Sequence, residues 1–357
     1  MRFTKMNWKR SLNFGQDEVV GLDIGSSAVK VVRLRKDNGG YVVTAAGIVQ
    51  IEPNQHHEGH RADANTAKAI SQCLQSAGVQ TKLAVCSVCG PEVAMRDFKF
   101  PSLPPEELEG AVTLEAAQIC PFDTADIAID YQVMSDGDGS IRGVLVAATS
   151  GLIKKKLQLT KKASVDCVLM DVDGLALLNC LGEYEPREPG RATAILNVGR
   201  NYTTLAVMGD NELPFIRDMA YAGDNIIKQI AAQTGQSVET VTAILSGRQQ
   251  CQFDLRDNLE KACERLIVDV NETLRFYAAQ EKLSIAERIF VCGGFALVSE
   301  FVEVLNRRLA VKAVLWNPFD KMSLGGGWHR RDLPQKDVLQ KNGPAMAVAA
   351  GLAMRSI

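Results

Sequence analysis

Two short motifs, far apart in the chain, have the residue types of a phosphate-binding hairpin. In each, an apolar strand ends in Asp or Asn, an apolar residue and Gly follow, and small or hydroxyl residues lead into a second apolar strand. Without bulky side chains, the backbone N–H groups of such a turn can approach a phosphate closely. Two of these hairpins facing each other would hold the phosphate tail of a nucleotide from both sides. The motifs occupy residues 19–32 and 194–207.

The first motif has side chains suited to a phosphate and its metal ion. Gly25, Ser26 and Ser27 would offer backbone and hydroxyl donors, and Lys30 has the reach to meet a phosphate oxygen as a point charge. Asp23 would hold Mg²⁺ through water, because this hard ion prefers oxygen ligands and keeps much of its hydration shell. Any one of these glycines is equally typical of an ordinary hairpin, so the prediction depends on the whole pattern.

The second motif would close on the same phosphates from the other side. Its candidate donors are Gly199, Arg200, Asn201 and Thr203. Tyr202 is bulky for a hairpin tip. The second hairpin therefore matches the phosphate-binding pattern less closely than the first.

Length and composition are those of a soluble protein with two domains. The chain has 357 residues, of which 46% are hydrophobic and 23% charged, and its net charge is −2. A near-neutral charge gives no global basic field for nucleic acid, and no apolar run is long enough to cross a bilayer. The nine cysteines are an odd number in apolar patterns, which favours reduced thiols in a cytoplasm.

Apolar patterns predict two halves that start alike. Three strands are expected at residues 19–24, 28–35 and 41–50, and the second half repeats them at 193–198, 203–208 and 213–218. A block with the order β-α-β-β-α, at residues 95–162, is a candidate inserted subdomain. Strands at 82–87, 167–171 and 288–291, helices at 64–77, 173–181, 296–309 and 345–354, a largely helical stretch at 222–283 and a loop-like stretch at 318–344 complete the prediction.

Three other groups of residues could form a metal, redox or calcium site, but for each of them a purely structural interpretation is favoured. A loop with His56, His57 and His60 lacks a second cluster to complete a metal site, so a solvated loop is favoured. Cys86 and Cys89 form a lone CxxC at a strand end, which is more typical of core cysteines than of a redox pair. The acidic loop at residues 136–139 lacks the closing Glu of an EF-hand, so a hairpin turn is expected.

Several further stretches, in this order and spacing, resemble one family. Strands repeated at the start of each half, each with a phosphate hairpin, resemble the actin, sugar kinase and Hsp70 superfamily. Within it, the chain resembles the type IV pilus assembly protein PilM family, relatives of the division protein FtsA. The most distinctive match is EAAQICPF at 115–122 with DYQV at 130–133. The other matches are at 96–101, 103–104, 106–108, 171–177 and 347–353.

The resemblance implies an α/β architecture, namely the actin-like ATPase (ribonuclease H-like) two-lobed fold with an FtsA-type inserted subdomain. A flexible leader at residues 1–17 would precede the first actin-like domain. The implied divisions are 18–91 for the first domain, completed by 166–191 and 340–357; 92–165 for the inserted subdomain; 192–221 and 286–339 for the second domain; and 222–285 for a helical subdomain.

The resemblance also implies ATP and Mg²⁺ as ligands, with weak or absent ATPase activity. Asn197 stands where the family usually has Asp, and an amide carries no negative charge for Mg²⁺. Asp171 is the candidate for orienting the attacking water, while a capping role for the helix that begins near Asp173 is equally open. The residues that resemble the adenosine-binding turn of the family are Gly293, Gly294 and Phe295.

In function, the resemblance implies a cytoplasmic ATP-binding scaffold of the type IV pilus inner-membrane assembly complex, and no nucleic-acid partner. It would be peripheral on the inner membrane, bound to the N-terminal cytoplasmic peptide of a bitopic PilN-like protein and to other pilus components, and self-association stays open. An extended peptide would lie in a groove between the inserted subdomain and the first domain. Residues 95–100 and 108–119 are its candidate walls, although each apolar side chain there is more typical of core.

Three alternatives stay open. A filament-forming actin-like ATPase would show magnesium-dependent turnover and sediment with ATP. The equivalent scaffold of a type II secretion system would have a similar layout. A small-molecule kinase of the same superfold would need a convergent carboxylate and a sugar-sized pocket, and the sequence has a signature for neither.

Overall fold

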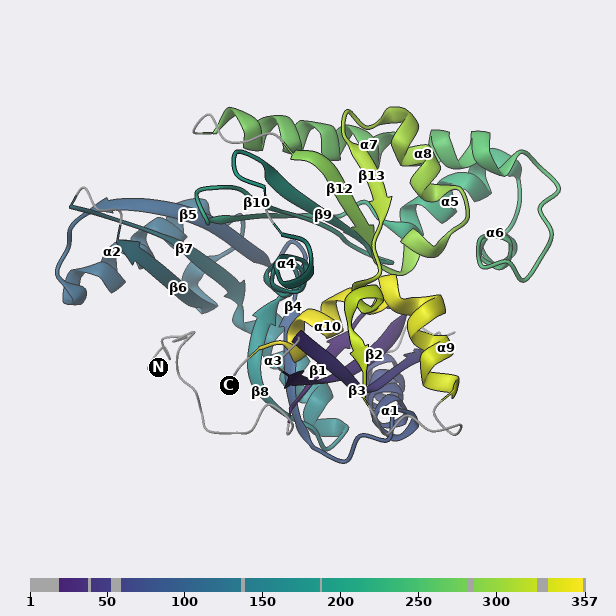
Figure 1. Ribbon diagram of the computed structural model, residues 1–357, viewed down its shortest axis with the longest axis horizontal. Helices are drawn as coiled ribbons and strands as arrows, with labels where there is room; N and C mark the ends of the chain where they lie inside the picture. Colours follow the sequence, from purple (N-terminus) through teal and green to yellow (C-terminus); the bar gives the residue numbers. More distant parts are fainter. Residues whose placement is uncertain are drawn as a thin grey trace.

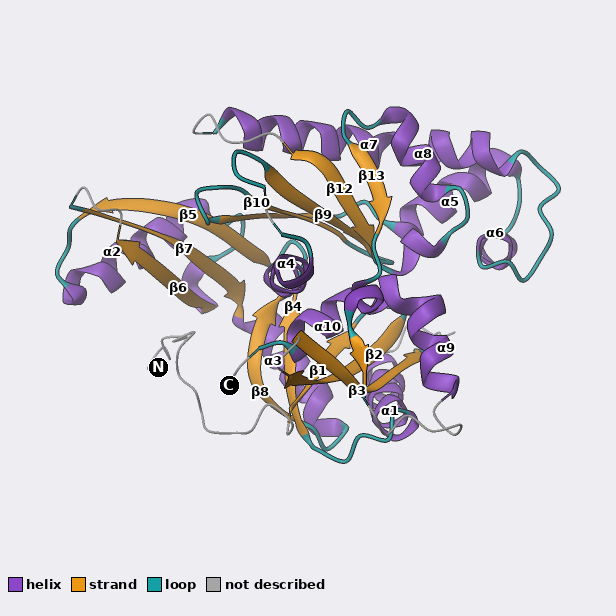
Figure 2. Ribbon diagram, viewed as in Figure 1, coloured by secondary structure: helices purple, strands orange, loops and turns teal. Residues whose placement is uncertain are grey.

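The computed structural model describes residues 19–37, 40–52, 59–135, 139–186, 188–280, 286–325 and 333–355. In these residues the chain builds two large sheets and one small sheet, with helices between and around them (Figures 1 and 2). The predicted leader, the loop with His56 and His57, and most of the acidic turn at 136–139 lie outside the described residues. Within the described part, no helix is both long and apolar enough to cross a membrane.

The first large sheet, here called the lobe 1 sheet, has the strand order β14-β3-β2-β1-β4-β8. Every residue of β1 is buried, because helices cover both faces of the sheet at its centre. Its strands are β1 (Val19–Ile24), β2 (Ala28–Asp37), β3 (Gly40–Gln50), β4 (Leu83–Val88), β8 (Asp166–Val172) and β14 (Ser323–Leu324).

The second large sheet, the lobe 2 sheet, repeats this arrangement. Its order is β11-β10-β9-β12-β13, so an antiparallel meander is again followed by a strand parallel to the first strand of the meander. In lobe 1 the corresponding parallel pair is β1 with β4. The predicted internal repeat is confirmed. The strands are β9 (Ala192–Val198), β10 (Thr203–Met208), β11 (Pro214–Met219), β12 (Ala286–Cys292) and β13 (Lys312–Leu315).

The small sheet is inserted between β4 and β8 and has the order β5-β7-β6. Helix α2 (Pro105–Ile119) covers it, and the predicted β-α-β-β-α order is confirmed. The residues Leu108, Val112 and Ala116, spaced by four, put one face of α2 against Phe98 and Leu145. The strands of this inserted sheet are β5 (Val93–Pro101), β6 (Ile127–Ser135) and β7 (Ser140–Thr149).

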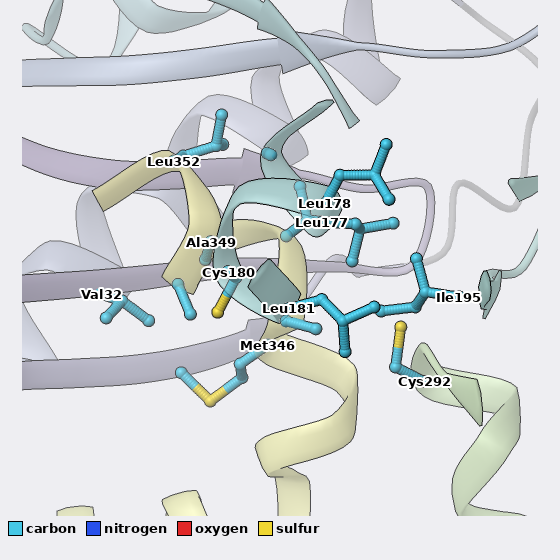
Figure 3. Packing of buried hydrophobic residues seen from close by; sticks show 14 of the residues in the cluster. Val32, Leu177, Leu178, Cys180, Leu181, Ile195, Cys292, Met346, Ala349 and Leu352 are labelled. Atoms are coloured by element: carbon cyan, nitrogen blue, oxygen red, sulfur yellow. The ribbon is translucent and has the colours of Figure 1, made fainter. Parts of the chain in front are cut away.

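Helices α4 (Asp173–Tyr184) and α10 (Ala347–Ala353) form the layer between the two large sheets. They cross at close range, since a Cβ atom on Gly351 would collide with the carbonyl of Ala176. On one side α10 packs on β1 and β2 of lobe 1, with Val32 near Ala349, and on the other side α4 packs on β9, β10 and β11 of lobe 2, near Ile195 (Figure 3). One hydrophobic core therefore joins the two lobes.

The remaining helices cover the outer faces. Helices α1 (Gly59–Ser76) and α3 (Ser150–Lys162) lie on the outer face of the lobe 1 sheet. On lobe 2, the outer helices pack through residues such as Ile226, Leu266 and Phe301. They are α5 (Gly223–Thr234), α6 (Val238–Leu245), α7 (Leu255–Ala279) and α8 (Phe301–Arg308).

Two sequence predictions near the C-terminal end are wrong. The helix predicted at 296–309 is a short 3-10 turn, Gly294–Leu297, followed by α8, and Glu300 between them has a left-handed backbone with φ +68°. The stretch predicted as loop contains β14 and α9 (Leu333–Asn342). Helix α9 has a weak apolar periodicity and packs by Leu339 on the core between the lobes, so tertiary contact stabilises it.

Candidate functional site

The first predicted hairpin forms between β1 and β2. The N–H of Gly25 donates to the carbonyl of Ala28 at 3.1 Å and closes the turn. Asp23 and Lys30 are opposite each other on the two strands, and Lys30 Nζ lies 2.9 Å from Asp23 Oδ2. Their side chains are only 12% and 13% exposed. A Cβ on Gly25 would come within 2.9 Å of Lys30 Nζ, so the glycine leaves room for the ammonium.

The two serines occupy the tip of this turn. Ser26 is exposed and Ser27 half-buried. The carbonyl of Ser27 accepts a 2.8 Å hydrogen bond from the N–H of Ile51, which fixes the exit of the turn against the end of β3. The hairpin tip therefore presents small side chains on a backbone held from behind.

The second predicted hairpin forms between β9 and β10 and is tied to the start of α5. The N–H of Gly199 donates to the carbonyl of Tyr202 at 3.0 Å, and the carbonyl of Gly199 accepts from Gly223 at 3.1 Å. The guanidinium of Arg200 pairs with Asp224 at 2.9 Å. Asn201 is exposed at the tip. Arg200 therefore already has a carboxylate partner within lobe 2.

Two predicted ligand residues of lobe 2 point into its core instead. Thr203 is fully buried, and its hydroxyl donates to the carbonyl of Tyr221 at 2.8 Å. Phe295 is buried with its ring edge-on to Phe301, 5.0 Å between centroids. The prediction that these side chains contact a nucleotide is therefore corrected: a threonine at the start of β10 and a phenylalanine after the glycine turn complete the hydrophobic packing of lobe 2.

Asn197 and the glycine turn after β12 lie in direct contact. Gly293 has φ +94°, and a Cβ there would come within 2.5 Å of Asn197 Oδ1. The N–H of Gly293 donates to the carbonyl of Pro344 at 2.9 Å, which joins this turn to the segment before α10. A Cβ on Gly294 would meet open space. Asn197, Gly293 and Gly294 are therefore brought together at the junction of the lobes.

Asp173, the first residue of α4, is a buried carboxylate with a strongly raised pKa, a property common in catalytic groups. Burial and, next, the negative charge of Asp23 raise the pKa of its carboxyl from 3.8 to about 7. A hydrogen bond with Ser87 and the ammonium of Lys156 oppose this effect, and the charge of Asp218 adds to it. Asp173 therefore shares one electrostatic environment with groups from both lobes.

Asp218, on β11, connects lobe 2 to the segment that follows β4. Its carboxylate accepts from the N–H of Gly90 and from the hydroxyl of Thr204, both at 2.6 Å. The ring of Tyr202 lies 3.1 Å from the position of a Cβ on Gly90, whose φ of +104° also requires glycine. Burial raises the pKa of Asp218. The second hairpin therefore borders the same region as Asp173, with Tyr202 packed between the lobes.

Asp171 does not have the role expected for it. Its side chain is fully buried and forms a close ion pair with Arg355 after α10. It does not cap α4 either, because the N-cap position is Val172 and no side chain makes a capping hydrogen bond. Asp171 and Asp173 stand two residues apart where β8 ends and α4 begins. Of the two, Asp173 is the one close to the charges of Asp23, Lys156 and Asp218. The signal for Asp173 was its place at the start of a helix directly after a strand whose last two residues are buried.

The CxxC cysteines behave as core thiols. A hydrogen bond with Cys167, followed by burial, raises the pKa of Cys86 well above its usual value. Burial, with the charges of Asp173 and Asp218, does the same for Cys89. All nine cysteines are free, and the raised pKa values of Cys86 and Cys89 disfavour the reactive thiolate at these two positions.

No group of three or more His, Cys, Asp or Glu side chains in the described part of the chain could hold a metal ion by itself. Near the first hairpin, the carboxylates present are Asp23 and Asp173. Any metal ion at Asp23 would need water or phosphate oxygens for its other ligands.

The repeated sheets, the helices packed between them and the two hairpins at their junction define the actin-like two-lobed fold. The chain is 22% identical over 361 residues to the cell division protein FtsA of Bacillus subtilis (strain 168), covering 90% of this chain and 77% of FtsA. It belongs to the type IV pilus assembly protein PilM family, whose model matches residues 21–357.

Two solved structures share the fold. A PilM-PilN type IV pilus biogenesis complex matches with a TM-score of 0.79 at 24% identity, covering 95% of this chain and 98% of the other. The ethanolamine utilization protein EutJ from Carboxydothermus hydrogenoformans matches with a TM-score of 0.54 at 13% identity, covering 98% of each chain.

Proposed function

We propose that this chain is an ATP-binding scaffold of the type IV pilus inner-membrane assembly complex, acting on the cytoplasmic face of that membrane. The observation that carries the nucleotide part is the nearly buried Lys30–Asp23 pair behind the glycine turn, in the environment of Asp173. A nearly buried ammonium beside a turn of small residues suits a polyanion. Membership of the PilM family carries the pilus part and favours it over the type II secretion alternative.

The nucleotide would be held mainly by backbone groups. The turn at residues 25–27 and Lys30 would bind the terminal phosphates, with Gly199 and Asn201 on the other side. Asp23 would hold Mg²⁺ through water. The backbone of Gly293 and Gly294 would admit the adenosine, since Phe295 is committed to the core.

Asp173 replaces Asp171 in our proposal as the group that orients the attacking water. A carboxyl with a pKa of about 7 is divided between its two protonation states at neutral pH, which suits a general base but leaves it partly neutral. Asn197 adds no charge for the metal. Both features support slow hydrolysis, in keeping with a scaffold whose nucleotide sets its shape.

The partner we propose is the N-terminal cytoplasmic peptide of a PilN-like membrane protein, since one similar solved structure is a PilM-PilN complex. The predicted β5 wall needs revision, because β5 contacts β11 of lobe 2 and β6 lies at the opposite edge of the inserted sheet (Figure 1). Met95, Phe98 and Leu108 are core residues. We place the extended peptide along β6, which pairs within the described residues only with β7.

Calorimetry with ATP and Mg²⁺ tests the nucleotide site. Lys30→Glu should abolish binding, because it puts a second carboxylate beside Asp23 at the phosphates. Lys36→Glu makes the same charge change at an exposed position on β2 and should bind like the wild type. Equal affinity of the two variants would show that the hairpin does not hold the nucleotide.

Fluorescence anisotropy with a labelled PilN N-terminal peptide tests the partner site. Val133, on β6, is 42% exposed, and Leu114, on the outer face of α2, is 64% exposed. Val133→Lys should weaken binding by about tenfold or more, because a lysine on an edge strand opposes addition of another strand. Leu114→Lys is the matched control and should leave affinity unchanged. The opposite result would move the peptide to α2.

A further inference from the structure

The inserted sheet and α3 form one continuous unit. β7 ends at Thr149 and α3 begins at the next residue, Ser150. The Thr149 hydroxyl caps α3 by accepting from Leu152 N–H at 3.3 Å, and it also donates to Glu92 Oε1 at 2.7 Å. The N–H of Thr149 donates to the carbonyl of Glu92 at 3.1 Å, so both chain crossings into the sheet are bonded together here. A displacement of α3 must therefore move the inserted sheet.

Helix α3 also reaches the phosphate hairpin directly. Lys156 Nζ donates to the carbonyl of Ile24 at 2.6 Å. Ile24 is the last residue of β1, and its carbonyl belongs to the peptide group whose N–H is that of Gly25. Lys154, also on α3, makes a surface contact instead, with Asp126 at 3.5 Å. A charged donor on a half-buried carbonyl is a strong contact, and this one joins α3 to the first peptide of the turn.

The segment between β4 and β5, through which the chain enters the inserted sheet, is also bonded to lobe 2. Gly90, between β4 and β5, donates to the buried carboxylate of Asp218 at 2.6 Å. With this crossing bonded to lobe 2, a shift of α3 would turn the inserted sheet about its Gly90 end.

We propose that Lys156 is a positioning residue that transmits occupation of the phosphate hairpin to the inserted sheet. A phosphate held by the turn at residues 25–27 and by Lys30 displaces the first peptide group of the turn, while the N–H of Gly25 stays bonded to the carbonyl of Ala28. The ammonium of Lys156 then follows the carbonyl of Ile24. Helix α3 then shifts, and β7 and β6 move with it. The inference rests on the proposed ATP site and adds the route by which ATP alters the partner surface. By linkage, a peptide on β6 would alter ATP affinity by the same factor.

Hydrogen exchange of the full chain with and without ATP and Mg²⁺ tests this route. In the wild type, ATP should change amide exchange in β6 and β7 by about fivefold or more. In Lys156→Met this difference should disappear at an ATP concentration that calorimetry shows to saturate the variant. Lys155→Met, its exposed neighbour on α3, is the matched control and should behave like the wild type.

Each other outcome overturns the inference. If Lys156→Met keeps the exchange difference, the contact with Ile24 transmits nothing. If that variant folds but binds no ATP, Lys156 belongs to the binding site itself. Lys156→Arg, which restores a cationic donor, should recover the difference, and its failure to do so in a folded, ATP-binding variant also contradicts the inference. A wild type that binds no ATP would refute the proposed function separately, by calorimetry alone.

Discussion

Replacing Asp173 by Asn should change how the stability of the free protein depends on pH. The pKa of the Asp173 carboxyl is about 7 in the folded protein and 3.8 in its ordinary environment. Between these values the folded state binds more protons than the unfolded chain, so the free energy of unfolding falls as the pH rises. The stabilisation is complete below about pH 4 and is lost as the pH passes 7. Because the amide of the Asp173→Asn variant has nearly the same shape but does not ionise, that variant should not lose this stability as the pH rises.

The magnitude follows from the window in which the two states differ. Between pH 5 and pH 8 the unfolded carboxyl is already ionised, whereas the folded one ionises only near pH 7. At 1.36 kcal/mol per pH unit, the wild type should lose about 2.5 kcal/mol more stability over this interval than Asp173→Asn. The subtraction removes the contribution of groups whose pKa values do not depend on Asp173.

Urea unfolding at pH 5 and at pH 8, followed by circular dichroism, measures this difference. The control is Asp337→Asn on the exposed side of α9, which reports the effect of exchanging a carboxylate for an amide at the surface. The effect of Asp173 is the excess over this control. A stability difference between wild type and Asp173→Asn that is equal at both pH values, within about 0.5 kcal/mol, would refute the burial argument.

Three further predictions concern other parts of the site. Gly293→Ala should lower the free energy of unfolding by about 3 kcal/mol, because φ is +94° and the new Cβ would press on Asn197. Gly294→Ala is the control: its Cβ would face open space, so it should cost under about 1 kcal/mol in the same urea titration. Arg355→Ala should cost about 3 kcal/mol, because Asp171 would be left buried without its cation, and adding Asp171→Asn should restore part of this stability. Asn197→Asp should strengthen the Mg²⁺ dependence of ATP affinity in calorimetry, and an unchanged dependence would mean that this side chain does not face the ion.

Much of the fold could be predicted because the strands are short and continuously apolar. The run Val19–Ile24 was predicted with its observed bounds, and the meanders that begin both halves were predicted in order. Helix α2 also follows from local signals, with Pro105 and two acidic residues in its first turn. Elements without such signals were missed. β13 has four residues, and α9 depends on Leu339 packing against the core between the lobes.

The amino-acid sequence alone determined which turns contain glycine and that each half of the chain would fold into the same meander. These are local properties, set by side-chain size and apolar period. Only the tertiary structure decided which polar side chains reach the junction of the lobes. Thr203 turns into a core, Asp171 pairs with an arginine 184 residues away, and Asp173 acquires a raised pKa from groups on other elements. Burial and neighbouring charge depend on contacts between distant segments, so no local pattern encodes them.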